Sequence, residues 1–213
     1  MAKREDGKET RLRLIHAGCT LFAAKGFRDT KVAEICKMAG ANVASVNYYF
    51  GDKKSLYCEV WQHALEKLPD PFEIIPADDP PESRLRQYIR ILIRSFTDTG
   101  DLRTFSRLYL LELVQPTGLI QDAWHDSIQP RRIKLYKLIG ELLNDHKDEL
   151  AIRICELSLI NQCRFLVTMK ESDIEHMLGR RLDCDFLKLL ADKIADFVIA
   201  GIHAIHTGNQ QRS

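Results

Sequence analysis

Small and polar side chains lie close together between Phe27 and Leu56, with lysines on either side. An asparagine can bond the N6 and N7 atoms of adenine, a serine can bond a base or a phosphate, and a valine or alanine can touch a thymine methyl. A lysine in the first turn of a helix, beside the backbone N–H groups there, can hold a phosphate. These residue types predict contacts to DNA. The candidate residues are Thr30, Lys31, Asn42, Val43, Ala44, Ser45, Asn47, Tyr48, Tyr49 and Lys53.

Two short helices joined by a glycine turn are expected to position these side chains. The first begins after Thr30, which we predict to be its N-cap. Gly40 makes the turn, and the second helix runs over residues 43–49. This is the layout of a helix-turn-helix, whose second helix lies in the major groove. The inner face of the first short helix is predicted to consist of Val32, Ile35 and Met38.

Longer helices are predicted on both sides of this pair. Residues 8–25 show the spacing of one buried face, and Gly18 within that face predicts close packing against a neighbouring helix. Gly26 is expected to end this helix as a left-handed cap, with Phe27 folded back on it. Asp52 is predicted to cap a fourth helix that runs to about residue 68.

The rest of the chain also has helical periodicity. The segment at 69–81 holds five of the seven prolines, which excludes a continuous helix there and marks a domain junction. We predict an all-α fold with a three-helix helix-turn-helix domain over 1–68 and a helical domain over 69–213. Helices of the second domain are expected over 82–97, 102–114, 119–143 with a kink or restart at Pro130, 149–170 and 185–207.

Composition and charge fit this division. The 213 residues carry a net charge of +1, divided into +4 over 1–68 and −3 over 69–213, so the basic part coincides with the predicted DNA reader. The chain has no apolar run of membrane-spanning length and no signal-peptide pattern at its N-terminus, so we expect a cytoplasmic protein without a membrane partner. The six cysteines have no zinc spacing and are expected to be buried free thiols.

An enzyme is the alternative that the sequence supports least. His203 and His206 stand three residues apart on a predicted helix, but no carboxylate or cysteine accompanies them at metal-ligand spacing. The chain has no glycine-rich phosphate loop and no nucleophile elbow. We therefore expect no catalytic residues, no metal and no cofactor.

The segments LIHAGCTLFAAKGF, TKVAEICKMAG, ANVASVNYYF and GDKKSLY resemble the first four helices of TetR-type transcriptional regulators over about residues 10–60. The resemblance implies an N-terminal DNA-binding domain and a C-terminal domain that binds a small-molecule effector and dimerises. Two residues depart from the family pattern, which usually has Tyr at Asn47 and Ala at Cys36. The ANVASVNYYF form also looks like a TetR subfamily associated with antibiotic-sensitivity genes.

An effector cavity is then expected among the helices of the second domain, with apolar walls and a few polar groups. Aromatic residues at helical spacing belong to the hydrophobic core more often than they line a cavity. Each aromatic candidate is therefore either a core residue or a lining residue. Glu112 and Arg164 stand in apolar patterns and are expected to pair with each other or with a ligand. The candidate lining residues are Phe105, Tyr109, Glu112, Trp124, His125, Asn161, Gln162 and Phe165.

The two long helices over 149–170 and 185–207 are the predicted dimer interface, as a four-helix bundle with a second copy. A homodimer places its recognition helices about 34–36 Å apart and so reads a near-palindromic operator. We expect a repressor that its effector releases from double-stranded DNA; the alternatives are a ligand-dependent activator and a sequence-indifferent architectural binder. The residues expected to fill the bundle are Leu157, Leu159, Ile160, Leu166, Leu187, Leu190, Ile194, Phe197, Val198 and Ile202.

Overall fold

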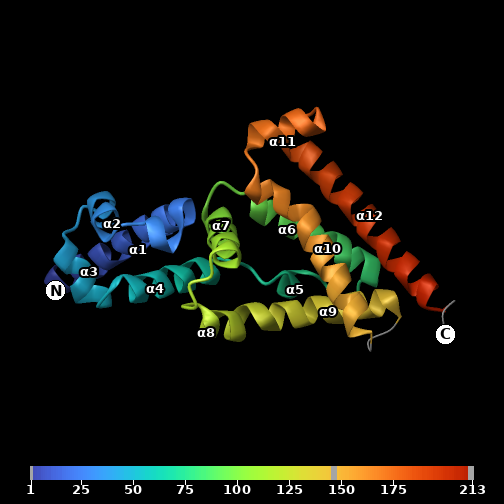
Figure 1. Ribbon diagram of the computed structural model, residues 1–213, viewed down its shortest axis with the longest axis horizontal. Helices are drawn as coiled ribbons and strands as arrows, with labels where there is room; N and C mark the ends of the chain where they lie inside the picture. The colour runs from blue at the N-terminus through green and yellow to red at the C-terminus, as the bar shows by residue number, and fades with distance from the viewer. Residues whose placement is uncertain (1, 145–147, 211–213) are drawn as a thin grey trace. The chain divides into compact units, whose positions relative to one another are not determined.

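The computed structural model describes residues 2–144 and 148–210, in which every regular element is a helix. These residues form two compact units. The first joins the chain up to Leu68 to Thr99–His125, and the second joins Pro69–Asp98 to the chain from Asp126 onward. The helices of the first unit, labelled in Figure 1, are α1 (Ala2–Asp29), α2 (Val32–Ala39), α3 (Val43–Phe50), α4 (Lys53–Glu66), α7 (Asp101–Val114) and α8 (Gln121–Ala123).

The expected domain boundary after residue 68 coincides with a boundary between the units, but residues 99–125 pack with the first unit and not with the second. The reason is that α7 lies against both α1 and α4. Phe105 on α7 meets Trp61 of α4 edge-on, with ring centroids 5.4 Å apart. The helix-turn-helix therefore shares its core with a helix that sequence reasoning had assigned to the other domain.

The long first helix has the predicted break. Gly26 has φ 79° and ψ 174°, outside the helical region and also outside the left-handed helical one, and α1 continues for one short turn beyond it. The expected return of Phe27 onto this helix is confirmed, since its ring stacks on that of Phe22 with centroids 6.2 Å apart. Gly40 is left-handed, with φ 61° and ψ 37°, and ends α2 as expected.

Two predictions for α2 were wrong. Its N-cap is Lys31, whose backbone N–H donates to the Glu34 carboxylate at 3.1 Å, and not Thr30. The Thr30 side chain is fully buried and its hydroxyl donates to the Gly26 carbonyl at 2.7 Å. Met38 is 52% exposed, whereas Cys36 takes a buried position on the inner face.

Gly18 brings α1 close to α4, as its place in the buried face predicted. A methyl group built on Gly18 would lie 2.6 Å from Cγ2 of Val60, which is too close for carbon atoms. Because Val60 is fully buried and β-branched, it cannot turn away cheaply.

We therefore expect Gly18→Ala to lower the free energy of unfolding by about 1–3 kcal/mol, although alanine favours helix more than glycine does. Urea denaturation measures this change. Adding Val60→Ala removes the clash, so the double variant should lose less stability than the sum of the two single losses. Simple additivity of the two losses would show that the contact is not the cause.

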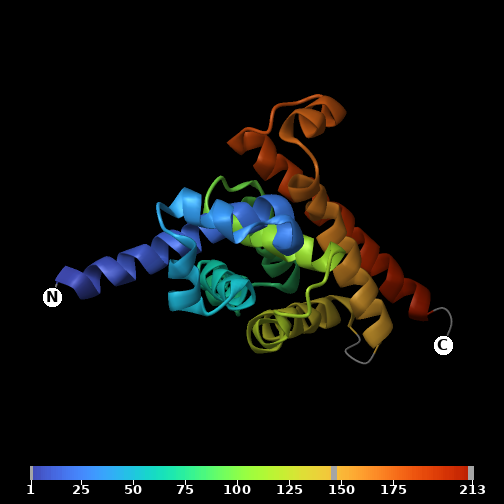
Figure 2. The same ribbon diagram turned by 60° about the vertical axis from the view of Figure 1, so that its left-hand side comes forward.

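The second unit packs four helices around one aliphatic core, with two shorter helices beside them. In Figures 1 and 2, α10 and α12 run side by side. None of the helices within the described ranges is long and apolar enough to cross a membrane. The helices of this unit are α5 (Pro71–Ile74), α6 (Pro81–Thr97), α9 (Gln129–Leu143), α10 (Glu149–Thr168), α11 (Glu171–Leu178) and α12 (Cys184–Gln210).

Of the kink or restart predicted at Pro130, the structure has the restart. A π-helical turn, Trp124–Ile128, precedes α9, because a proline has no N–H to continue the hydrogen-bond ladder. The sequence did not predict α5 or α11, which are a single turn and two turns long.

Half of the residues expected to fill a dimer bundle belong to this unit's own core. Leu159, Leu166, Ile194, Val198 and Ile202 are buried against neighbouring helices of the same chain. Ile160, Leu187 and Leu190 are partly buried against that core. Leu157 and Phe197, by contrast, are 53% and 69% exposed. Of the two helices predicted to form the dimer bundle, α10 and α12, only the outer faces that carry Leu157 and Phe197 are therefore available to a second copy.

Candidate nucleic-acid interface and effector cavity

The N-terminus of α3 is fixed by its own asparagine. Oδ1 of Asn42 accepts from the Ser45 backbone N–H at 2.9 Å and from the Ser45 hydroxyl at 3.0 Å. This N-cap stabilises a helix of two turns that is too short to stand alone. Since Oδ1 is committed to the cap, Asn42 can offer a base or phosphate its amide nitrogen but not a two-bond contact.

The outward face of α3 has the expected composition. Val43 and Tyr48 are 50% and 82% exposed, and Ala44 and Asn47 are exposed as well. Val46 and Phe50 are buried and hold the helix on the unit. Asn47 is therefore the residue of this face that can present a whole carboxamide to a base edge. Tyr49 is half-buried, so its ring packs more than that of Tyr48.

A second group of donors lies where α4 begins. The Asp52 carboxylate caps the helix by accepting from the Ser55 backbone N–H at 2.7 Å, a bond that lowers the pKa of Asp52. Nζ of Lys53 lies 4.5 Å from the centroid of the Phe27 ring and donates to the Arg28 carbonyl at 3.4 Å. Partial burial lowers the pKa of Lys53. The ammonium is thus held in place, while Lys54 beside it is exposed.

The two residues expected at the start of α2 differ in what they can do. Lys31 is exposed and can reach a phosphate. The Thr30 hydroxyl cannot, because it is buried and bonded to a carbonyl of α1. The Thr30 hydroxyl therefore joins the end of α1 to α2. A phosphate contact through the Thr30 backbone stays a prediction.

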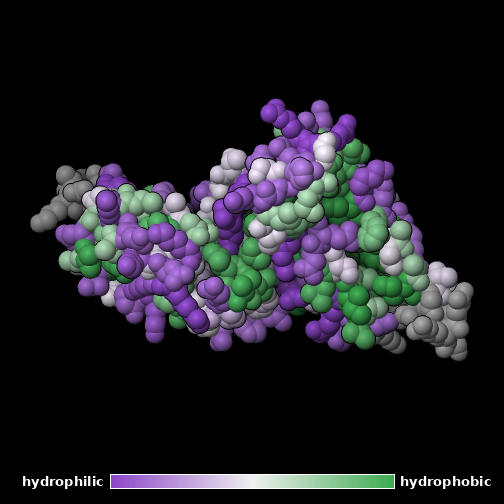
Figure 3. Space-filling view, turned by 45° about the horizontal axis from the view of Figure 1, so that its top comes forward, coloured by the Kyte–Doolittle hydropathy of each residue, from purple (hydrophilic) through white to green (hydrophobic). Residues whose placement is uncertain are grey.

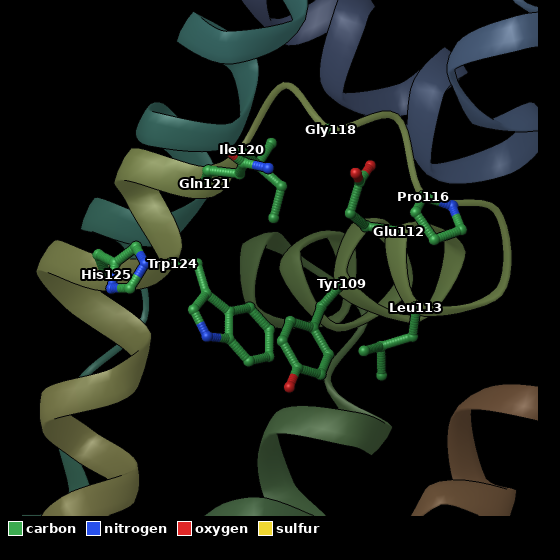
Figure 4. Close-up of a pocket in the computed structure, with 9 residues that line it drawn as sticks. All are labelled: Tyr109, Glu112, Leu113, Pro116, Gly118, Ile120, Gln121, Trp124 and His125. Carbon is green, nitrogen blue, oxygen red and sulfur yellow. The ribbon is translucent and has the colours of Figure 1, made fainter.

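The first unit also contains a cavity of about 440 Å³. Its walls come from the end of α7, the loop over residues 115–120, and the turn that begins at Trp124 (Figure 4). The rings of Tyr109 and Trp124 are stacked, with centroids 5.6 Å apart and planes inclined by 5°. The lining residues are Tyr109, Glu112, Leu113, Pro116, Gly118, Ile120, Gln121, Trp124 and His125.

The cavity brings together half of the predicted effector residues. Tyr109, Glu112, Trp124 and His125 line it. Phe105 is buried and packs on Trp61, so for this residue the core interpretation holds. Sequence reasoning missed the loop residues, for which only the Pro-Thr-Gly interruption gave a signal. Asn161, Gln162 and Phe165 lie on α10 in the second unit and do not line this cavity.

Glu112 does not form the ion pair with Arg164 that the sequence suggested. Its side chain is buried, and its carboxylate accepts from the Tyr57 hydroxyl at 2.9 Å. It also accepts from the backbone N–H of Thr117 at 2.7 Å and from the Thr117 hydroxyl at 2.8 Å. Because Tyr57 belongs to α4, this carboxylate joins the cavity wall to the helix that follows α3.

The cysteines are free thiols, of which Cys36, Cys155 and Cys163 are buried and Cys184 is exposed. Burial raises the pKa of Cys163 to about 12 and is the main cause that raises the pKa of Cys19 to about 11, so both thiols stay protonated and unreactive. The described residues contain no group of three histidine, cysteine or acidic side chains that could hold a metal ion. His203 instead lies 3.4 Å from the Glu82 carboxylate.

Comparison with known families agrees with this geometry. Residues 14–60 match the family described as "Bacterial regulatory proteins, tetR family". Residues 81–202, more than half of the chain, match the "HTH-type transcriptional dual regulator CecR, C-terminal domain". The chain belongs to the TetR family of transcriptional regulators, with a C-terminal domain of the CecR type. The resemblance of residues 10–60 to TetR proteins is thereby confirmed, as is the all-α fold.

Curated relatives of this TetR-family protein are also named as regulators. The transcriptional regulator RutR of Escherichia coli K12 is 27% identical over 109 residues, which are 51% of this chain and 50% of RutR. The dual regulator CecR of Shigella flexneri is 26% identical over 146 residues, 63% of this chain and 65% of CecR. The chain thus spans about half the length of the first curated relatives it matches and about two thirds of CecR.

A solved structure of a transcriptional regulator from Saccharomonospora viridis in complex with choline has the same fold. Its TM-score is 0.66 at 17% identity, and the match covers 90% of this chain and 96% of the other.

Proposed function

We propose that this TetR-family protein is a repressor that binds a near-palindromic operator as a homodimer and is released by a small organic effector. The observation that carries the proposal is the outward face of α3. This face exposes Asn47 and Tyr48 on a helix that is capped by Asn42 and followed by the fixed ammonium of Lys53. A surface of this kind reads base edges and holds the backbone beside them. The protein would then act in the cytoplasm, where its DNA target lies.

Dimerisation is supported by apolar side chains on α10 and α12 that this chain leaves uncovered. Leu150, Ile154 and Leu157 recur along the outer face of α10, and Leu189 and Phe197 do so on α12. Figure 3 shows apolar areas that interrupt the polar surface of the second unit. A symmetric dimer through these faces would present two copies of α3 to successive major grooves.

Release by an effector is supported by a chain of contacts inside the first unit. The cavity residue Glu112 accepts from Tyr57, whose ring lies 5.0 Å from that of Phe27. The Phe27 ring in turn carries the Lys53 ammonium. A ligand that moves Glu112 therefore disturbs packing that positions a proposed phosphate contact, and it shifts the population toward a form with lower operator affinity.

The first experiment is the selection of bound duplexes from a random DNA pool, with affinities measured at two salt concentrations. Recovery of one near-palindrome, bound with a stoichiometry of two chains, is the expected result. Equal binding to all duplexes would overturn the proposal in favour of an architectural binder. If ligands that saturate the cavity leave the operator affinity unchanged, release by an effector is contradicted. The protein would then remain a sequence-specific DNA binder.

Activation is the second candidate, because the matched C-terminal family and the Shigella relative are both named dual regulators. The selected operator decides between the two roles through its place in a promoter. Transcription measured with purified polymerase on such a promoter falls for a repressor and rises for an activator when the protein is added.

Single substitutions should separate the two kinds of DNA contact. Lys53→Ala is expected to weaken binding to the operator and to random duplex alike and to lower the salt slope by about one unit, because a phosphate contact is lost. Asn47→Ala should cost about 1–3 kcal/mol at the operator and leave random-duplex binding nearly unchanged, because a base contact is lost. Titrations of both duplexes by fluorescence anisotropy measure this.

Lys37→Ala is the matched control. Lys37 is exposed near the end of α2 and is not among the proposed contacts. If Asn47→Ala reduces the affinity for the operator and the affinity for random duplex equally, Asn47 contacts a phosphate and not a base.

A further inference from the structure

The cavity on the first unit has a one-sided charge. Among its nine lining residues, Glu112 is the one acidic side chain, and none is a lysine or an arginine. His125 is the remaining ionisable group that could carry a positive charge, and it lies on an exposed position of the turn after α8. The walls otherwise consist of aromatic, aliphatic and amide groups. The lining therefore offers negative charge and no fixed positive charge to a ligand.

The hydrogen bonds of Glu112 leave its charge without a counter-ion. All three of its partners, the Tyr57 hydroxyl and the N–H and hydroxyl of Thr117, donate to the carboxylate. No ion pair found in the described part of the chain includes Glu112. A buried carboxylate that is bonded but not neutralised remains an attractive site for a cation, since the surrounding low dielectric strengthens the interaction.

The stacked pair of rings adds a surface that favours a flat cation. The rings of Tyr109 and Trp124 are almost parallel, with centroids 5.6 Å apart, and both residues line the cavity (Figure 4). The rings of Trp61 and Phe105 pack around Tyr109 and limit its movement. Aromatic faces attract ammonium groups, and the face of tryptophan does so most strongly. Trp124 also begins a π-helical turn, a local geometry that is frequent at functional sites.

We propose that this cavity binds a flat organic cation, namely a protonated or quaternary amine fused to an aromatic ring system. The ring system lies against Tyr109 and Trp124, and the cationic nitrogen is attracted by Glu112. The cavity volume of about 440 Å³ fits a ligand of two or three fused rings. This assignment rests on the proposed function to the extent that such a cation would be the effector.

The ligand would act on the bond between Glu112 and Tyr57. A cation near the carboxylate competes with the Tyr57 hydroxyl for the same oxygen atoms. The Tyr57 side chain is almost completely buried, so a change in its hydrogen bond is transmitted to the rings of Phe22 and Phe27. The Glu112 carboxylate therefore determines the preferred charge of the ligand and also connects the bound ligand to α4 through Tyr57.

The test compares three ring systems of similar shape and different charge in the absence of DNA. Calorimetry measures the binding of 1-methylquinolinium, of neutral quinoline at neutral pH and of 2-naphthoate to the wild-type chain. We expect the cation to bind at least ten times more tightly than quinoline and the anion to bind most weakly. Equal affinities, or tighter binding of the neutral or anionic compound, would overturn the proposal.

Two variants locate the effect. Glu112→Gln keeps the shape and can still accept from Thr117, while its amide can donate to the Tyr57 oxygen; it should therefore fold, and it should lose the preference for the cation. Asp122→Asn removes a negative charge from an exposed position of α8 that does not line the cavity, and it should retain the preference. If Glu112→Gln is unfolded by thermal melting, the wild-type comparison of the three compounds still decides the matter.

Operator release is measured separately, with a control for binding of the compounds to the duplex alone. Cation binding without a change in operator affinity would uphold the ligand class and contradict effector release. Release by a neutral or anionic compound, together with absence of cation binding, would contradict the ligand class and leave the proposed repressor intact.

Discussion

Replacing Arg132 with methionine is expected to lower the free energy of unfolding by about 3 kcal/mol. Glu156 on α10 is buried, and its two carboxylate oxygens accept from Nε and a terminal nitrogen of Arg132 on α9 at 2.6 and 2.7 Å. Loss of the guanidinium leaves a buried carboxylate with only the Tyr136 hydroxyl, at 3.3 Å. Breaking a buried pair from one side commonly costs 3–5 kcal/mol, and the 34% exposure of the Arg132 side chain places this case at the lower end.

Two further variants show whether the unpaired carboxylate is the cause. Arg132→Met combined with Glu156→Leu replaces both charges by apolar groups and should recover most of the lost stability. Lys188→Met removes a cationic side chain from an exposed pair with Asp185 and should change stability by less than about 0.5 kcal/mol. Urea denaturation followed by circular dichroism measures all of them. A double variant as unstable as Arg132→Met alone would show that the arginine stabilises through packing instead.

The helices were predictable because apolar spacing and end signals agree along most of the chain. Asp52 caps α4 and Gly40 ends α2 as their residue types indicate. The errors have local physical causes. Glu34 reaches back to the Lys31 backbone and so moves the start of α2 by one residue, which frees the Thr30 hydroxyl for burial. Helical spacing also fits either Met38 or Cys36 as an inner residue, and tertiary packing makes the choice.

The cavity was predictable only in part. Tyr109, Glu112 and Trp124 were recognised as candidates because they are polar or aromatic residues in apolar helical patterns. The partners of Glu112 could not be predicted, because Tyr57 is 55 residues away along the chain and Thr117 approaches through a loop. Periodicity locates faces of helices but does not determine which faces meet. This is also why α7 was assigned to the second domain although it packs on α1 and α4.

The exposed apolar face of α12 leads to the largest expected effect on DNA binding. Phe197 is 69% exposed, and the residues on the following turns of the same face, Ala200, Gly201 and Ala204, are exposed and small. A methyl group built on Gly201 would meet no atom within 4 Å, so the chain itself does not fill the space beside it. A large ring next to small residues can interlock with the same face of a second copy across a two-fold axis.

Phe197→Asp should therefore make the protein monomeric and reduce its operator affinity at least a hundredfold, because each monomer then engages a half-site alone. Sedimentation and operator titration measure the two effects. The chain should still fold, since Phe197 contributes little to the core of its own unit. Met177→Asp is the matched control: Met177 is 70% exposed on α11, and its substitution introduces the same charge outside the proposed interface. If Phe197→Asp still dimerises, or if Met177→Asp loses the dimer equally, the interface does not lie on this face of α12. The predicted spacing of the two α3 helices would then have to be derived from another interface.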